Sequence, residues 1–214
     1  MRSRGLGADL IAPLSLVPDD LGIYYDPTQP SRLETLIEAS PTLPDVAARR
    51  AEAIIARITG AGLSKYNLST DPLPDLPKRR RILVPGQVED DASIRLGTTD
   101  VCTNRDLLLA ARAANPAAII LYKPHPDVEA GLRDGHVDDA TDIADVVLTR
   151  TSPIAALGAV DGVWTMTSTL GFEALLRGAA DIAAIGPRRS NRLSPLFRPR
   201  HKPALPHRCG HRPP

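Results

Sequence analysis

The chain has 214 residues, 43% hydrophobic but only 3% aromatic, so a globular core must rest largely on Leu, Ile, Val and Ala. The formal net charge of +1 hides an uneven distribution, because residues 187–214 carry seven Arg, one Lys and no acidic residue. Residues 1–186 carry 18 basic and 25 acidic side chains, and such an acidic body argues against a nucleic-acid partner. No apolar run approaches the ~20 residues of a membrane span, and no signal-peptide pattern opens the chain, so a cytoplasmic protein is expected.

Residues 1–30 are rich in Gly, Pro and Asp and hold only short apolar pieces. They are expected to be the remnant of a segment that lies against another part of a protein. The next region, 31–80, is predicted to be a helical segment followed by a linker. Ser31 and Glu34 have capping-box spacing, which predicts a helix over 33–39.

A second helix is predicted to start at Leu43-Pro-Asp45 and to end at Gly60 and Gly62, because apolar side chains recur between them at steps of three and four residues. These positions are Val46, Ala47, Ala51, Ile54, Ile55 and Ile58. The arginines between them are interpreted as the solvated face of the helix; they are Arg49, Arg50 and Arg57.

Two basic stretches stand outside this helical region. The linker ends in Lys78-Arg-Arg-Arg81, which has no interleaved aromatic residues and is interpreted as an exposed approach to the next domain. Residues 187–214 are dominated by Pro and Arg and show no periodicity, which predicts a disordered tail. An arm for nucleic acid or an anionic membrane is the alternative for that tail.

Residues 81–186 alternate apolar runs with helical patterns, which predicts an α/β fold with a Rossmann-like parallel sheet. Strands are predicted at 82–85, 117–122 and 163–166, with a further apolar run at 143–148. Helices are predicted at 104–114, 152–157 and 170–177. The acidic stretch 131–142 is predicted to be a loop.

The strongest functional signal lies at two strand ends, where a doubly wound sheet places its ligands. After 117–122, Lys123 and His125 are interleaved with Pro124 and Pro126, which cannot donate ladder hydrogen bonds and stiffen the turn. Lys123 and His125 are therefore expected to project beyond the sheet. For His125, a hydrogen bond to a loop carbonyl is the alternative.

After 163–166, the chain supplies Thr167, Ser168 and Thr169 just before a predicted helix. One of these hydroxyls is expected to cap the helix, and a hydroxyl-rich helix start is a natural seat for phosphate. A cap without any ligand is the alternative for Ser168. The two strand ends together indicate a site for a phosphate-bearing ligand.

Several longer motifs run from the start of the chain to residue 178. They are Gly5-Leu-Gly-Ala-Asp-Leu10, Pro13-Leu-Ser-Leu16, Asp19-Asp-Leu-Gly-Ile-Tyr-Tyr-Asp26, Leu83-Val-Pro-Gly-Gln-Val-Glu-Asp-Asp-Ala-Ser93, Tyr122-Lys-Pro-His-Pro-Asp-Val128 and Thr165-Met-Thr-Ser-Thr-Leu-Gly-Phe-Glu-Ala-Leu-Leu-Arg-Gly178. With these motifs the sequence resembles the capsular polysaccharide biosynthesis and export family, the retaining β-Kdo transferases that build the lipid-anchored linker of bacterial capsules. The resemblance implies a GT-B architecture, in which the Rossmann-like carboxyl-terminal domain holds the donor; most of this chain corresponds to that half.

The donor that the resemblance implies is CMP-Kdo. His125 and Pro126 match the His-Pro motif that contacts the cytidine nucleotide, and Ser168 and Thr169 match the motif that holds its phosphate. Lys123 or His125 is expected to offset phosphate charge. After strand 82–85, Gln87, Glu89 and Asp90 are expected to meet sugar hydroxyls. In the helix at 170–177, Glu173 is expected to touch the ribose. For Glu89 and Asp90, the alternative is that they are solvated loop acids.

The implied partners are the nucleotide-sugar donor, a glycolipid acceptor in the parent enzyme, and proteins of capsule assembly and export. The parent protein is expected in the cytoplasm, with peripheral attachment to the inner membrane as a further option. No cofactor is expected, because Gly5-Leu-Gly7 lacks the third glycine and the strand context of a dinucleotide site. No metal is expected either, since Cys102 and Cys209 share no metal-ligand spacing.

The sequence departs from the family pattern at both ends. The family places an acidic Glu-Asp-Gly-Phe-Leu motif, part of its acid/base apparatus, just before the stretch at which this chain begins, so the acidic pair is expected upstream of Met1. An ordered segment of the family is replaced here by the 187–214 tail, as a reading-frame shift would produce. The expectation is therefore a fragment that binds the donor but lacks the catalytic carboxylate. The alternative is the nucleotide-sugar-binding subunit of a split transferase that acts with a partner chain.

Overall fold

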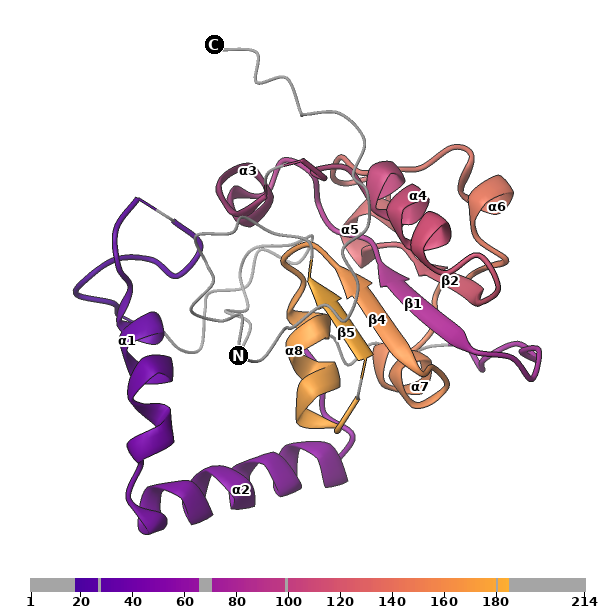
Figure 1. The fold of residues 1–214 in the computed structure, drawn as a ribbon. Coiled ribbons are helices and arrows are strands. Elements are labelled where there is room, and N and C mark those ends of the chain that lie inside the picture. Colours follow the sequence, from indigo (N-terminus) through magenta and orange to yellow (C-terminus); the bar gives the residue numbers. More distant parts are fainter. Residues whose placement is uncertain (1–17, 27, 66–70, 99, 180, 185–214) are drawn as a thin grey trace.

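The computed structural model describes residues 18–26, 28–65, 71–98, 100–179 and 181–184, which are coloured along the chain in Figure 1. The expected tail at 187–214 lies outside the described residues, and so does most of the 1–30 segment. Met1, upstream of which the acidic pair of the family was expected, is also outside them. The described structure therefore does not test the expectations for either end of the chain.

A single parallel sheet of five strands organises the described chain. The strands are β1 (Arg81–Pro85), β2 (Ile119–Lys123), β3 (Val146–Val147), β4 (Gly162–Thr165) and β5 (Asp181–Ala184), and their order across the sheet is β3-β2-β1-β4-β5. The chain builds outward from β1 to β3 on one side and then crosses back to β4 and β5 on the other. The strand order therefore reverses between β1 and β4, where sheets of this kind bind their ligands.

Apolar side chains alternate along β1 and supply a core on each face of the sheet. Ile82 and Val84 belong to the cluster that also contains Leu107 and Leu108, whereas Leu83 belongs to the opposite cluster. The first face is covered by α4 (Asn104–Ala114) and α6 (Ala140–Ile143), and the second by α7 (Pro153–Gly158) and α8 (Thr169–Leu176). Both faces of the sheet are thus buried, as the continuously apolar strands predict.

The structure contains short elements that the sequence patterns did not predict. They are α3 (Ala92–Gly97), α5 (Pro126–Glu129) and β5. The prediction of a loop over 131–142 is wrong in its last part, because α6 begins at Ala140. Elements of four to six residues are too short for a periodic pattern, and their packing on the sheet determines their conformation.

The amino-terminal helices form an L beside the sheet domain (Figure 1). They are α1 (Arg32–Ala39) and α2 (Asp45–Gly60), joined by the 3-10 turn η1 (Ser40–Thr42). The predicted capping box is confirmed, since the Glu34 amide donates to Ser31 Oγ at 3.2 Å and the Ser31 amide donates to Glu34 Oε2 at 2.8 Å. Within the described residues, no helix combines the length and apolar character needed to cross a bilayer.

The apolar stripe of α2 is not covered by the described part of the protein. No residue of α2 is buried, and Val46 is 72% exposed. The arginines of the opposite face are exposed, as predicted; they are Arg49, Arg50 and Arg57. The periodicity therefore predicted the helix correctly, but it did not predict that the apolar stripe stays exposed among the described residues.

Candidate functional site

The predicted site residues gather at the carboxyl edge of the sheet. Gln87 follows β1, Lys123 ends β2, and Ser168 lies three residues beyond β4. Because β1 lies between β2 and β4, the residues from these two strands are about two strand spacings, or roughly 10 Å, apart. A nucleotide can reach across such a distance. The catalytic acidic pair, expected upstream of Met1, stays a prediction that the described residues do not test.

Lys123 is a buried lysine at the carboxyl end of β2. It is 6% exposed, and its ammonium group has no hydrogen-bond or ion-pair partner among the residues that the structure describes. Burial lowers its pKa, although the charge of nearby Glu129 acts in the opposite direction. Glu129 Oε1 already accepts the Arg150 amide at 2.7 Å. An ammonium held in this way at a ligand-binding edge is suited to receive an anion.

His125 is held in one orientation by the helix that it begins. Its Nδ1 accepts the Asp127 amide at 3.1 Å, which makes His125 the N-cap of α5, and Pro126 occupies the first helical position. A ring nitrogen that accepts a hydrogen bond carries no proton, so this bond assigns the ring proton to Nε2. The histidine therefore has a local capping role, which differs from the carbonyl contact considered from the sequence.

The start of α8 combines a satisfied cap with open donors. Ser168 Oγ accepts the Leu170 amide at 3.2 Å, so Ser168 does cap this helix. The Ser168 amide in turn donates to Thr165 Oγ1 at 3.1 Å. The amide and hydroxyl of exposed Thr169 contact no acceptor in the described chain. A free amide and a hydroxyl at a helix start are suitable phosphate ligands.

The three residues that follow β1 have different surroundings. Gln87 is buried and its amide is bonded to Thr167, whereas Asp90 is exposed and pairs with Arg133 at 2.8 Å. Asp90 thus fits the alternative of a solvated loop acid. Glu89 is half-buried and accepts the Asn104 amide at 2.7 Å. Burial raises the pKa of Glu89, while that hydrogen bond lowers it.

Glu173 presents an unsatisfied acceptor one turn into α8. Its side chain is 7% exposed, and Oε1 accepts the Lys65 amide at 2.8 Å. Oε2 is buried without a hydrogen-bond partner in the described structure. A ligand hydroxyl would satisfy this oxygen, and the contact with Lys65 links α8 to the segment that follows α2.

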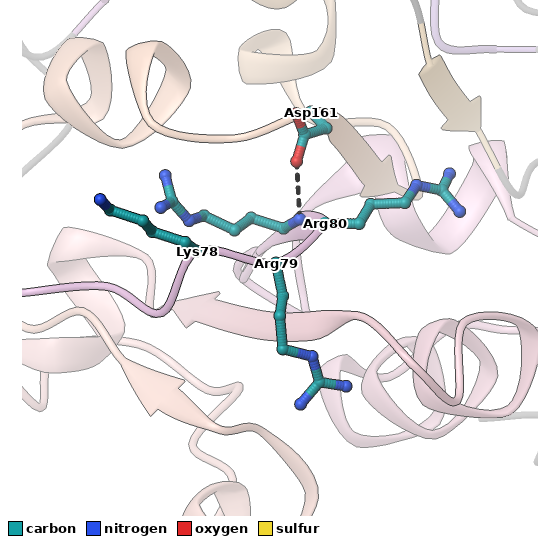
Figure 2. Close-up of a pocket in the computed structure, with 5 residues that line it drawn as sticks. Lys78, Arg79, Arg80 and Asp161 are labelled. Carbon is teal, nitrogen blue, oxygen red and sulfur yellow. Dashed lines mark hydrogen bonds between the residues drawn. The ribbon is translucent and has the colours of Figure 1, made fainter.

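A pocket lies at the opposite edge of the sheet, where β1 begins, and is lined by Lys78, Arg79, Arg80, Arg81 and Asp161 (Figure 2). Its guanidinium groups are occupied by internal contacts. Arg79 donates to the Ala117 carbonyl, Arg80 pairs with Asp181, and Arg81 donates to the Pro77 and Ala159 carbonyls. Figure 2 shows the labelled basic side chains pointing in different directions, so this pocket fastens the linker rather than concentrating charge on one ligand.

Three polar residues organise the carboxyl edge through contacts that the sequence did not reveal. Thr165 and Thr167 connect the loop after β1 to the turn after β4, and Asn104 fixes the same loop to the start of α4. Asn104 begins a predicted helix and Thr165 and Thr167 belong to a noted motif, so only their contacts were unforeseen. Their partner, Gln87, is 17 to 80 residues away in sequence, and no local pattern reports such pairs.

The sequence matches the family described as "Capsule polysaccharide biosynthesis protein" over residues 1–67 and 54–186. It is 46% identical over 181 residues to the capsule polysaccharide modification protein LipA of Neisseria meningitidis serogroup A. That match covers 83% of this chain but 26% of LipA, so the chain spans about a quarter of this curated relative.

Two solved structures from Thermosulfurimonas dismutans have a similar fold. One is KpsC, beta Kdo 2,7 transferase, with a TM-score of 0.68 and 35% identity over 82% of this chain and 53% of the other. The second is KpsC, beta Kdo 2,4 transferase, with a TM-score of 0.69 and 33% identity over 82% of this chain and 56% of the other. Both similarities confirm the α/β, Rossmann-like fold expected from the sequence.

Proposed function

Because the chain belongs to the capsule polysaccharide biosynthesis protein family, we propose that it forms the donor-binding half of a Kdo transferase that uses CMP-Kdo. The solved neighbours carry the names of Kdo transferases, which supports the sugar. Their names give two different linkages, so the proposal extends to the donor and not to the bond that is made.

The observation that carries this proposal is the buried residue Lys123, whose ammonium has no hydrogen-bond or ion-pair partner among the described residues and which lies on the edge that also bears the start of α8. In CMP-Kdo a phosphodiester joins the cytidine ribose to the sugar. Lys123 and the Thr169 donors would hold its charged oxygens, and the His125 ring would contact the nucleotide. The Glu173 carboxylate would accept ribose hydroxyls, which would satisfy its buried Oε2.

The same contacts would favour departure of the leaving group. When the bond from the sugar to the phosphate breaks, negative charge builds on CMP, and a fixed cation with a helix start stabilises that charge. The acceptor of the parent enzyme is proposed to be a glycolipid of the capsule linker. The transfer of Kdo to this acceptor would take place at the inner membrane, with the protein attached peripherally.

The proposal is tested by calorimetric titration of CMP into the 214-residue chain, with UMP and AMP as comparison nucleotides. We expect saturable binding that prefers CMP. Lys123→Met should weaken CMP binding about tenfold to a hundredfold, because a charge-assisted hydrogen bond is lost. His125→Ala and Ser168→Ala should each weaken it about tenfold.

Lys78→Met is the matched control, because it removes an exposed lysine from the opposite edge of the sheet. It should leave CMP affinity unchanged. A folded chain that binds no CMP would show that the donor-site proposal is wrong. Equal loss in Lys78→Met and Lys123→Met would show that binding follows overall charge rather than this site.

A further inference from the structure

The buried amide of Gln87 connects the two strands between which the strand order reverses. Gln87 follows β1 and is 7% exposed. Its Nε2 donates to Thr167 Oγ1 at 2.8 Å, and its Oε1 accepts the Thr167 backbone amide at 3.0 Å. A backbone amide can only donate, so the atom facing it must be the oxygen, and the orientation of the side-chain amide is fixed.

A second contact carries this constraint to the start of α8. Thr165 is 2% exposed, and its hydroxyl donates to Gln87 Oε1 at 3.4 Å while accepting the Ser168 amide at 3.1 Å. Gln87 is thus bonded directly to Thr167 and reaches Ser168 through one hydroxyl. The positions of Thr167 and Ser168, which precede Thr169 at the start of α8, therefore both depend on the Gln87 side chain.

The backbone of Gln87 is fixed in turn by Asn104 at the start of α4. Asn104 Oδ1 accepts the Gln87 amide at 2.8 Å, and Asn104 Nδ2 donates to the Gln87 carbonyl at 2.7 Å. Asn104 is fully buried, so this pair of bonds is shielded from competition by water. Gln87 therefore has little freedom to turn toward a ligand.

We propose that Gln87 is a positioning residue of the donor site, which holds the Thr165–Thr169 turn so that the start of α8 presents its donors to phosphate. This inference rests on the proposed function and changes the role expected for Gln87, from a sugar contact to a support of the phosphate seat. Its oxygen accepts two bonds and one of its two N–H donors is engaged inside the protein, so only the second N–H remains for a ligand.

Replacement of the Gln87 side-chain amide should change the conformation of the Thr165–Thr169 turn more than the stability of the fold. In Gln87→Met the side chain keeps its length but makes none of these bonds, and CMP affinity should fall about tenfold. In the CMP-free protein, the backbone amide signals of Ser168 and Thr169 should shift in nitrogen–proton correlation spectra. The proposal would be overturned by a Gln87→Met protein with wild-type CMP affinity and unshifted signals at both residues.

Thr167 provides an independent arm of the test. Thr167→Val should weaken binding, whereas Thr167→Ser keeps the hydroxyl and should restore most of the affinity. The double variant with Gln87→Met should bind no worse than the weaker single variant, because both changes remove the same contact. Strictly additive losses would argue that the two residues act separately, which contradicts the proposal.

A pH arm separates positioning from general destabilisation. In Gln87→Glu the carboxylate still accepts the Thr167 amide, but until it is protonated the Thr167 hydroxyl must turn to donate to it and gives up its bond to Ser93 Oγ. Its CMP affinity, measured relative to the wild type at each pH, should recover as the pH falls. A ratio that does not change with pH would count against the proposal.

Asn115→Leu is the control, since Asn115 is also a buried amide but caps the far end of α4. It should lower stability without shifting the Ser168 and Thr169 signals. If the wild-type chain bound no CMP, the proposed function would fail. The amide signals of the CMP-free variants would then still decide whether Gln87 holds the turn.

Discussion

The two edges of the sheet both carry polar and basic side chains, yet only one has the features of a binding site. At the amino edge, Arg79, Arg80 and Arg81 are bonded to carbonyls and a carboxylate of the protein itself. At the carboxyl edge, Lys123 is buried and its side chain forms no hydrogen bond or ion pair with the described residues. The number of charges therefore does not identify a site.

What distinguishes the edges is how the polar groups are held. Gln87 and Asn104 form a buried network that is almost fully satisfied, and it supports groups that are not satisfied, such as the Thr169 amide. At the amino edge the arginine side chains form their bonds on the exposed surface instead. The following changes test this contrast, from the largest expected effect to the smallest.

Asn104→Leu should be the most damaging change, because it leaves the Gln87 amide and the Gln87 and Gly135 carbonyls without their buried partner. We expect the free energy of unfolding to fall by about 2 to 4 kcal/mol, measured by urea denaturation. Asn115→Leu loses only a bond to the Ala111 carbonyl and should cost about 1 kcal/mol. Equal losses would mean that the network adds nothing beyond the burial of one amide.

Gly135→Ala tests the same network through its backbone. Gly135 has a φ of +129°, and an added Cβ would lie 2.7 Å from Asn104 Nδ2 and from the Gln87 carbonyl oxygen. We expect a loss of about 2 to 3 kcal/mol together with weaker CMP binding. Gly131→Ala shares a positive φ, +70°, but meets no atom within 4 Å, and should cost about 1 kcal/mol. Thermal unfolding of the two variants separates the two causes: Gly131→Ala has backbone strain alone, whereas Gly135→Ala adds a steric clash of the new Cβ with Asn104 and Gln87.

The pH dependence of CMP binding tests the buried cation. Burial lowers the pKa of Lys123, so the folded chain releases this proton below the ordinary value of 10.5. CMP affinity should therefore decline as the pH rises through this lowered pKa, while folding stability gains over the same range because the unfolded chain still holds the proton. Titrations from neutral pH toward 10.5 should show this decline in the wild type but not in Lys123→Arg, which stays charged. An equal decline in both proteins would assign it to another group.

Arg80→Ala should have the smallest effect. The Arg80 and Asp181 side chains are 53% and 39% exposed, so their ion pair is well solvated. We expect stability to change by less than about 1 kcal/mol and CMP affinity to stay the same. A clear loss of CMP affinity would contradict the division between the two edges.

Most of the fold could be predicted from the sequence, because its longer elements have local signals. The capping box of Ser31 and Glu34, the periodicity of α4 and the hydroxyls before α8 all act within a few residues. β5 was missed since a strand of four residues forms only by pairing with β4. The exposure of α2 could not be foreseen either, because an apolar stripe indicates that a helix face needs a partner without identifying that partner.

The candidate site divides in the same way. Lys123, His125, Ser168 and Thr169 were predicted because they follow apolar runs, and the ends of parallel strands meet at one edge of a sheet. Gln87 was also predicted to belong to the site, but its partners were not foreseen. An amide in a loop reads as a ligand contact when nothing in the sequence shows that it is already bonded to a threonine 80 residues away.

The sequence alone therefore determined the α/β class, the main helices and strands, and the chemistry at the strand ends, since each depends on neighbouring residues. Only the tertiary structure decided that β4 lies beside β1, that Gln87 and Asn104 support the turn before α8, and that Lys123 is buried without a counter-ion in the described chain. Those outcomes depend on contacts between distant segments, which form when both faces of the sheet are buried together.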